Sequence, residues 1–287
     1  MSYLKSIGAI ALAAALSMTL FEAQAFDDAK YPNLKGRWNR FVVRGVTGQP
    51  SFDQTKPWGL GQEAPLTPEY QAVLEASIAD QAKGGQGNFR DSAGCHANGM
   101  PLMMQAFQPM EFVVTPEITY VLINNRDHGR RIYTDGRDWP KVIQPTFQGY
   151  SIGRWVEEVG GSRYDALEVE TRGPFKGPRV YDATGIPLHS DNQSLFKERI
   201  QTDQADSNVL HDEITVIDHA LTRPWIVDKR YVRSPDARPD WPEAVCDYNA
   251  QINIGRQDYF LSADGLLMPT KKDQPPPDTR YFNQTRK

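Results

Sequence analysis

The sequence predicts a mainly β protein, an antiparallel barrel or sandwich with one covering helix. From Glu111 onward, apolar residues recur at every second position, which is typical of strands with one buried face. Turn dipeptides such as Asp135-Gly136 and Gly160-Gly161 separate these segments. Strands do not alternate with helices along the chain, so a doubly wound parallel sheet is disfavoured.

The first predicted elements are one strand and one helix. The strand covers 34–43 and carries Trp38. Thr67 is placed to cap a helix that begins at Pro68 and ends before Gly84-Gly85. The apolar stripe of this helix is narrow, so we expect it to cover one end or side of a sheet rather than to join a helical bundle.

Eight further strands are predicted after the helix. Together with the first strand they make nine, which is enough to close a barrel around a filled or ligand-sized interior. The predicted ranges are 111–115, 118–124, 130–134, 149–159, 164–171, 195–202, 208–218 and 225–233.

Residues 1–25 have the pattern of a secretory signal. Lys5 gives a positive start, an apolar run follows, and Ala23-Gln24-Ala25 is a small-x-small cleavage site. The alternative, an N-terminal membrane anchor, is disfavoured because the apolar run is short. We therefore expect a periplasmic or secreted protein without a membrane segment after cleavage, with one barrel domain over 26–270 and a Pro-rich extended tail over 271–287.

Charge and cysteine content narrow the partners and the chemistry. The 32 basic and 36 acidic residues give a net charge of −4, so a nucleic-acid partner is not expected. Cys95 and Cys246 are the two cysteines of the chain, and a disulfide between them is the economical interpretation for an exported protein. The alternative is a catalytic thiol, for which His96 is the base adjacent in sequence.

Several motifs resemble those of known secreted β proteins. Gly36-Arg37-Trp38 resembles the G-x-W opening of lipocalin-type barrels, in which the tryptophan closes one end. The stretch from Met110 to Arg233 is similar to a large group of uncharacterised secreted bacterial proteins. This resemblance implies a calycin-like barrel and export, and it implies no reaction. The matching segments are 130–137, 149–155, 187–190, 197–199, 212–218 and 222–225.

Two predicted strands carry acidic residues on the face that their apolar residues mark as inward. The alternation in 208–218 places Asp212 and Asp218 on the apolar face, and the alternation in 195–202 does the same for Glu198. A charge enclosed by a sheet is costly unless it is paired or meets water. We therefore predict that these carboxylates pair with other charges or line a wet cavity.

Three further residues complete the predicted site. Arg131 and Tyr133 share one face of their strand, which we expect to point inward, and His189 lies on a loop that can reach a barrel mouth. A histidine that exchanges a proton, a carboxylate that orients it (Glu198 or Asp218) and an arginine that holds an oxyanion are the minimum for elimination, hydration or isomerisation. The alternative is structural, because interior ion pairs often only fix strand register and loop histidines are usually solvated.

The leading hypothesis is a barrel that binds a small, largely apolar molecule, such as a terpenoid, steroid or aromatic compound, and acts on it as a cofactor-independent lyase, hydratase or isomerase. A carrier without turnover is the main alternative, and a structural envelope factor is a third. No cofactor is expected, because the sequence has neither a P-loop nor a dinucleotide fingerprint. No metal is expected either, because the five histidines form no H-x-H or H-E-x-x-H pattern.

Overall fold

The computed structural model describes most of the chain between Asp27 and Pro269. The predicted signal, both cysteines and the Pro-rich tail lie outside the described residues, so the predictions made for them stay predictions. The described ranges are 27–40, 55–88 except 58, 97–241 except 107, 125–128, 158–160, 178 and 237, and then 251–254, 257–261 and 267–269.

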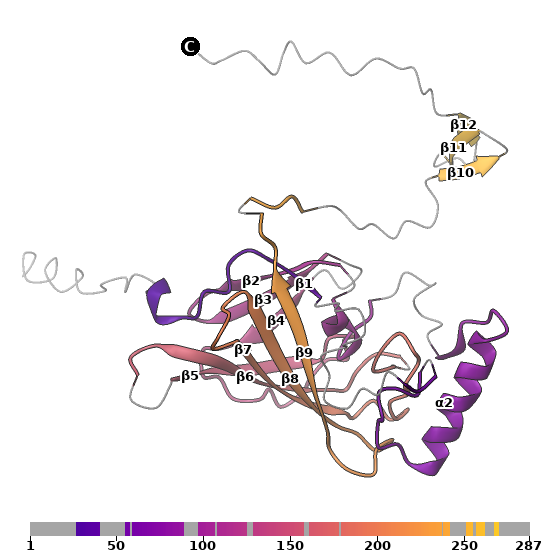
Figure 1. Ribbon diagram of the computed structural model, residues 1–287, viewed down its shortest axis with the longest axis horizontal. Helices are drawn as coiled ribbons and strands as arrows, with labels where there is room; N and C mark the ends of the chain where they lie inside the picture. Colours follow the sequence, from indigo (N-terminus) through magenta and orange to yellow (C-terminus); the bar gives the residue numbers. More distant parts are fainter. Residues whose placement is uncertain are drawn as a thin grey trace, which may run out of the picture.

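Nine strands form a closed barrel (Figure 1). Each strand pairs with the next along the chain, and the last strand pairs with the first. The prediction of a mainly β barrel is confirmed, and every predicted barrel strand overlaps an observed one. The strands are β1 (Arg37–Arg40), β2 (Met110–Val114), β3 (Ile118–Ile123), β4 (Arg130–Tyr133), β5 (Tyr150–Glu157), β6 (Tyr164–Arg172), β7 (Leu195–Thr202), β8 (Val209–Ile217) and β9 (Trp225–Arg233).

One pair of neighbouring strands departs from the antiparallel pattern. β4 and β5 run parallel, with Ile132 opposite Ser151. A two-residue hairpin cannot join parallel strands, so the connection over 134–149 has to carry the chain back along the barrel. The barrel is therefore mixed, and β4–β5 is its parallel seam.

The helix α2 (Pro68–Gln81) covers one end of the barrel (Figure 1). The hydroxyl of Thr67 accepts the N–H of Tyr70 at 3.4 Å, which is the predicted N-cap. The N–H of Thr67 donates to the carbonyl of Ala220 at 2.8 Å, and Leu66 bridges Leu221. These contacts attach the start of the helix to the connection between β8 and β9.

Large apolar and aromatic side chains form the buried core of the barrel. Trp38 is fully buried and donates its indole N–H to the carbonyl of Leu34 at 2.9 Å. The short 3-10 helix η3 (Leu102–Gln105) adds buried methionines to the same core, and the Tyr231 hydroxyl donates to the carbonyl of Met104. The largest fully buried apolar or aromatic side chains include Trp38, Tyr181, Tyr231, Phe196, Met100, Met103, Met104 and Met110.

The remaining elements lie outside the barrel sheet. The 3-10 helix η1 (Asp28–Lys30) precedes β1. After the barrel, β10 (Gln251–Ile254), β11 (Gln257–Leu261) and β12 (Leu267–Pro269) form a separate antiparallel sheet, which the sequence analysis did not predict. None of the helices in the described part of the chain has the length and apolarity needed to span a bilayer.

Candidate functional site

The arginine that enters the barrel from β4 is Arg130. The prediction placed Arg131 inward, and it is wrong by one position: Arg131 is exposed, with its guanidinium 5.8 Å from the Tyr120 ring centre. Tyr133 shares the outward parity of Arg131 and is half-buried. The reason is that Ile132, the aliphatic residue of this short strand, points inward, and Arg130 shares its parity.

Glu198 is enclosed by the barrel, as its parity predicted, and it binds Arg130. The Nη1 of Arg130 donates to Oε1 of Glu198 at 2.7 Å, and its Nη2 donates to Oε2. The hydroxyls of Thr171 and Ser151 accept from the same guanidinium at 2.6 and 3.1 Å. Burial opposes the charge of Arg130, but the carboxylate outweighs it and raises the pKa of Arg130. The bidentate pair joins β4 to β7, and the two hydroxyl contacts add β5 and β6.

A second pair of opposite charges, on β8 and β9, is buried in the same interior. Asp212 and Lys229 stand directly opposite each other in the register and are 0% and 4% exposed. Within the described part of the chain, neither carboxylate oxygen of Asp212 nor the Nζ of Lys229 has a hydrogen-bond partner. The Nζ lies 4.7 Å from the ring centre of Tyr181. These groups therefore keep their hydrogen-bonding capacity.

Burial shifts the protonation of both groups. Desolvation raises the pKa of Asp212 well above its ordinary value, and the nearby Glu198 carboxylate adds to the rise. Desolvation lowers the pKa of Lys229 to about 8, although the carboxylates of Asp212 and Asp182 oppose it. Because the two groups interact, they titrate as a pair. These shifts favour the uncharged forms of both groups. An uncharged carboxyl group can donate a proton, and an uncharged amine can accept one.

The connection between β6 and β7 adds polar groups beside this pair. The Tyr181 ring packs on Trp225 at 4.4 Å between centres, and within the described ranges the Tyr181 hydroxyl and the Trp225 indole N–H are buried without a partner. The neighbouring Asp182 differs, because it accepts from Gln62 at 3.1 Å and from the N–H of Thr184 at 3.0 Å. The unpartnered atoms thus gather around Lys229, Tyr181 and Trp225.

Asp218 lies at the end of β8 and joins two loops. Its Oδ1 accepts the N–H groups of His189 and Ala220, both at 2.8 Å, and its Oδ2 accepts the hydroxyl of Ser194. Asp218 is buried, in agreement with its predicted parity. Its contact with His189 is made by the backbone, so Asp218 holds the loop in place and does not orient the imidazole.

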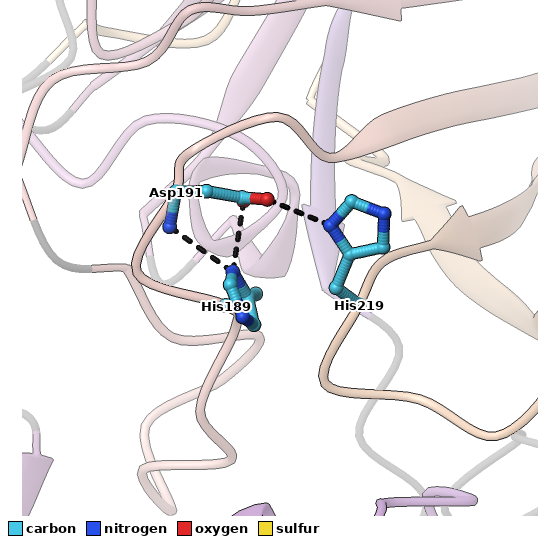
Figure 2. Close-up of side chains that lie close together, drawn as sticks. All are labelled: His189, Asp191 and His219. Atoms are coloured by element: carbon cyan, nitrogen blue, oxygen red, sulfur yellow. Dashed lines mark hydrogen bonds and ion pairs between the residues drawn. The ribbon is translucent and has the colours of Figure 1, made fainter.

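The imidazole of His189 faces two residues that the sequence analysis did not select (Figure 2). Its Nδ1 lies 3.1 Å from Oδ1 of Asp191, and Nδ1 of His219 lies 2.7 Å from Oδ2 of the same carboxylate. We call these three residues the His–Asp–His cluster. Burial disfavours the charge of Asp191, but the N–H of Gln193 and the two histidines outweigh it and lower the pKa of Asp191 to about 2.

A hollow of about 650 Å³ lies beside the His–Asp–His cluster, between α2 and the connection from β6 to β7. Its lining includes Tyr70 and Ser190. The Tyr70 ring lies 5.4 Å from the ring of His189, and the Tyr70 hydroxyl accepts the N–H of Ser190 at 3.3 Å. Arg179 also lines this hollow, and burial lowers the pKa of Arg179 to about 10.

The five predicted site residues therefore do not meet at one place. Glu198 lies in the interior, Asp218 and His189 lie at the loops of one barrel end, and Arg131 and Tyr133 lie on the outer face. The alternation in β9 could have predicted that Lys229 points inward, because Trp225, Val227 and Tyr231 mark the same face. Asp191 and His219 lie on separate loops, and no local pattern brings them together.

No protein-family model matches the chain, and no curated protein matches it at a significant level. The closed nine-stranded barrel is consistent with a calycin-like fold.

Proposed function

We propose that the barrel interior binds a small molecule with an apolar body and one polar end, and that Asp212 and Lys229 receive the polar end. The observation that carries this proposal is the pair itself: a carboxyl group and an amine, directly opposed, enclosed and without a hydrogen-bond partner among the described residues. Burying polar groups without such partners costs free energy whether or not they are charged. A molecule that supplies both a donor and an acceptor would remove much of that cost.

The surroundings of the pair favour an apolar or aromatic body. Ile214 and Val227 occupy the neighbouring inward positions of β8 and β9, and Trp225 and Tyr181 lie beyond them. The methionines around η3 belong to the same buried core, and methionine side chains adapt to irregular shapes. A terpenoid, steroid or aromatic compound that carries a carbonyl, hydroxyl or carboxylate group has the required chemistry.

We further propose that the interior acts on its ligand by acid–base chemistry. Elimination, hydration and isomerisation each need one group that accepts a proton and one that donates it. Asp212 and Lys229, with their pKa values shifted toward each other, supply these two roles, and the Tyr181 hydroxyl is a further donor. The enzyme class that follows is a cofactor-independent lyase, hydratase or isomerase. A carrier without turnover is the alternative that uses the same contacts.

Binding can be tested with a fluorescent probe of the expected chemistry, dansyl-labelled undecanoic acid, which has an apolar body and one carboxylate. We expect energy transfer from tryptophan to the bound probe, and at least about tenfold weaker binding in Lys229→Met, because a charged hydrogen bond contributes about 1.5–3 kcal/mol. Arg131→Met is the matched control, because it removes one positive charge from the outer face. Equal affinity of Lys229→Met and the unchanged chain would contradict the proposed site.

Turnover is tested separately from binding. The purified protein is incubated with extracts of the growth substrates of its host, and products are followed by mass spectrometry. A product that forms with the unchanged chain and not with Asp212→Asn supports the enzyme. Retained compounds that leave chemically unchanged support the carrier.

We also propose that the protein is exported and belongs with the secreted proteins that 110–233 resembles. The supporting observation is the pattern of 1–25, with a positive start, an apolar run and a cleavage site. Mass spectrometry of the protein from a periplasmic or culture fraction is expected to give a chain that begins at Phe26. The same measurement, with and without reduction before alkylation, tests the bond between Cys95 and Cys246. A chain of full length in the cytoplasm would contradict export.

A further inference from the structure

We propose that His189, Asp191 and His219 form a binding site for a divalent transition-metal ion of the zinc type. This site lies on the loops at one end of the barrel and uses none of the residues proposed for the interior. The proposal therefore does not depend on the function of the interior. It rests on the geometry of the cluster, on the contacts that hold it and on the chemistry of its donor atoms.

The three side chains already converge as ligands would. One donor atom from each lies within 4.8 Å of the other two. The Nδ1 of His219 points at the Asp191 carboxylate, and the Nδ1 of His189 lies beside the same carboxylate and accepts the N–H of Asp191 at 3.1 Å, a bond that an ion would displace (Figure 2). A tetrahedral zinc ion with bonds of about 2.0–2.1 Å holds its ligand atoms about 3.3 Å apart. His189 lies 3.1 Å from Oδ1 and His219 lies 2.7 Å from Oδ2 of the carboxylate, which are hydrogen-bond distances. An ion would replace these hydrogen bonds, and the donor atoms have to spread slightly to admit it.

The surrounding contacts hold the two loops in the required arrangement. Asp218 accepts N–H groups from His189 on one loop and from Ala220, next to His219, on the other. The N–H of Gln193 donates to Asp191 at 3.0 Å. Outer contacts of this kind fix the ligands of metal sites before the ion arrives. The buried Asp218 therefore acts as a positioning residue for the cluster.

The donor set selects the class of ion. Two imidazole nitrogens and one carboxylate suit zinc and neighbouring transition metals, whereas calcium and magnesium prefer oxygen ligands alone. Three protein ligands leave at least one position for water or another small ligand. The hollow that Tyr70 and Ser190 line lies directly beside the cluster. The spacing of the histidines along the chain does not predict this site, because the two loops meet only when the barrel closes.

The test uses the full chain freed of metal by chelation, with zinc chloride titrated by calorimetry and cobalt binding followed by visible absorption. We expect one zinc ion per chain and a cobalt spectrum of low coordination number. His219→Ala is expected to lower zinc affinity by more than the about 10–100-fold typical for loss of an outer contact. Its side chain is 74% exposed, so this variant is expected to fold normally. Asp191→Asn is expected to weaken binding in the same way.

His211→Ala is the matched control. Its imidazole also faces two aspartates, at 3.0 Å from Asp228 and 3.1 Å from Asp203, but no second histidine joins them in the described residues. We expect zinc affinity to stay within about twofold of the unchanged chain. Absence of zinc binding by the unchanged chain would overturn the proposal and leave the cluster as a hydrogen-bonded group. Zinc binding that survives both His219→Ala and Asp191→Asn would overturn it as well.

Discussion

Two pairs of opposite charges share the interior of this barrel, and they differ in how they are hydrogen-bonded. Arg130 and Glu198 bind each other through two contacts, and two hydroxyl groups accept two further N–H groups of the guanidinium. Asp212 and Lys229 are equally buried and directly opposed, yet they have no hydrogen-bond partner within the described residues. The comparison shows that burial alone does not define a structural ion pair. The first pair holds strands together, and the second has capacity left for a bound molecule.

The largest expected effect comes from breaking the first pair. Arg130→Met leaves the Glu198 carboxylate enclosed without its partner, and we expect the free energy of unfolding to fall by about 3–5 kcal/mol. Urea denaturation measures this loss. Arg131→Met is the control, because Arg131 is the neighbouring arginine that faces outward. A loss below about 1 kcal/mol would mean that the pair contributes little to stability.

Removing the second pair is expected to change the free energy of unfolding in the opposite direction. The double variant Asp212→Leu with Lys229→Met replaces two unpartnered charges by apolar side chains of similar size. We expect the ligand-free protein to be unchanged or more stable by about 1–4 kcal/mol, as seen when buried ion pairs are replaced. The same urea experiment measures it. A loss of more than about 2 kcal/mol would show that bound water satisfies the pair and stabilises it.

The pH dependence of stability sharpens the comparison, because it reports on Lys229. The ordinary pKa of 10.5 is lowered to about 8 in the folded chain. Between these values the unfolded chain holds a proton that the folded chain lacks, so the free energy of unfolding rises with pH by up to about 1.4 kcal/mol per pH unit. This gain in the free energy of unfolding is fully present above the pKa of the unfolded chain, and it is lost as the pH falls through the folded pKa of about 8.

The groups that act on Lys229 are three carboxylates, Asp212, Asp182 and Glu198, which raise its pKa, and Arg40, which lowers it. Comparing urea denaturation of the unchanged chain and of Lys229→Met across this pH range isolates the lysine, because tyrosines titrate in both proteins. We expect the rise to be absent in Lys229→Met. Identical pH profiles would show that Lys229 keeps its proton in the folded state.

The smallest effect is expected on the outer face of the same strand that carries Arg130. Arg131→Ala removes an exposed side chain whose described contact is with the Tyr120 ring. We expect the free energy of unfolding to change by no more than about 0.5 kcal/mol, measured by thermal unfolding. A loss comparable to that of Arg130→Met would reverse the assignment of the two faces of β4.

The fold could be predicted where the pattern is local. The helix has its cap, its proline and its narrow stripe in consecutive residues, and the strands alternate over eight or nine positions. In β7 and β8 two or more apolar side chains mark the inward face, so the inward positions of Glu198 and Asp212 were predicted correctly. In β4 the strand has four residues and Ile132 is its single aliphatic side chain, and the inward face was assigned to Arg131.

The candidate sites could be predicted only in part, because they depend on distances that no local pattern fixes. Parity indicates which residues enter a barrel, but it does not say which charges find partners there. Arg130 meets Glu198 across 68 positions of the chain. Asp191 meets His219 across 28 positions and through two loops. Such contacts follow from closure of the whole barrel, and a strand-by-strand prediction does not contain them.

The parallel seam makes the connection between β4 and β5 a suitable place for circular permutation. β1–β4 and β5–β9 are two antiparallel meanders, and the exposed Lys141 and Val142 lie on the link between them. Trp38 pairs with Arg233, so the two ends of the barrel sheet are adjacent. A circular permutant that opens the chain at Lys141 and joins those ends by a short linker would preserve every hairpin, because this link is a crossover and not a turn.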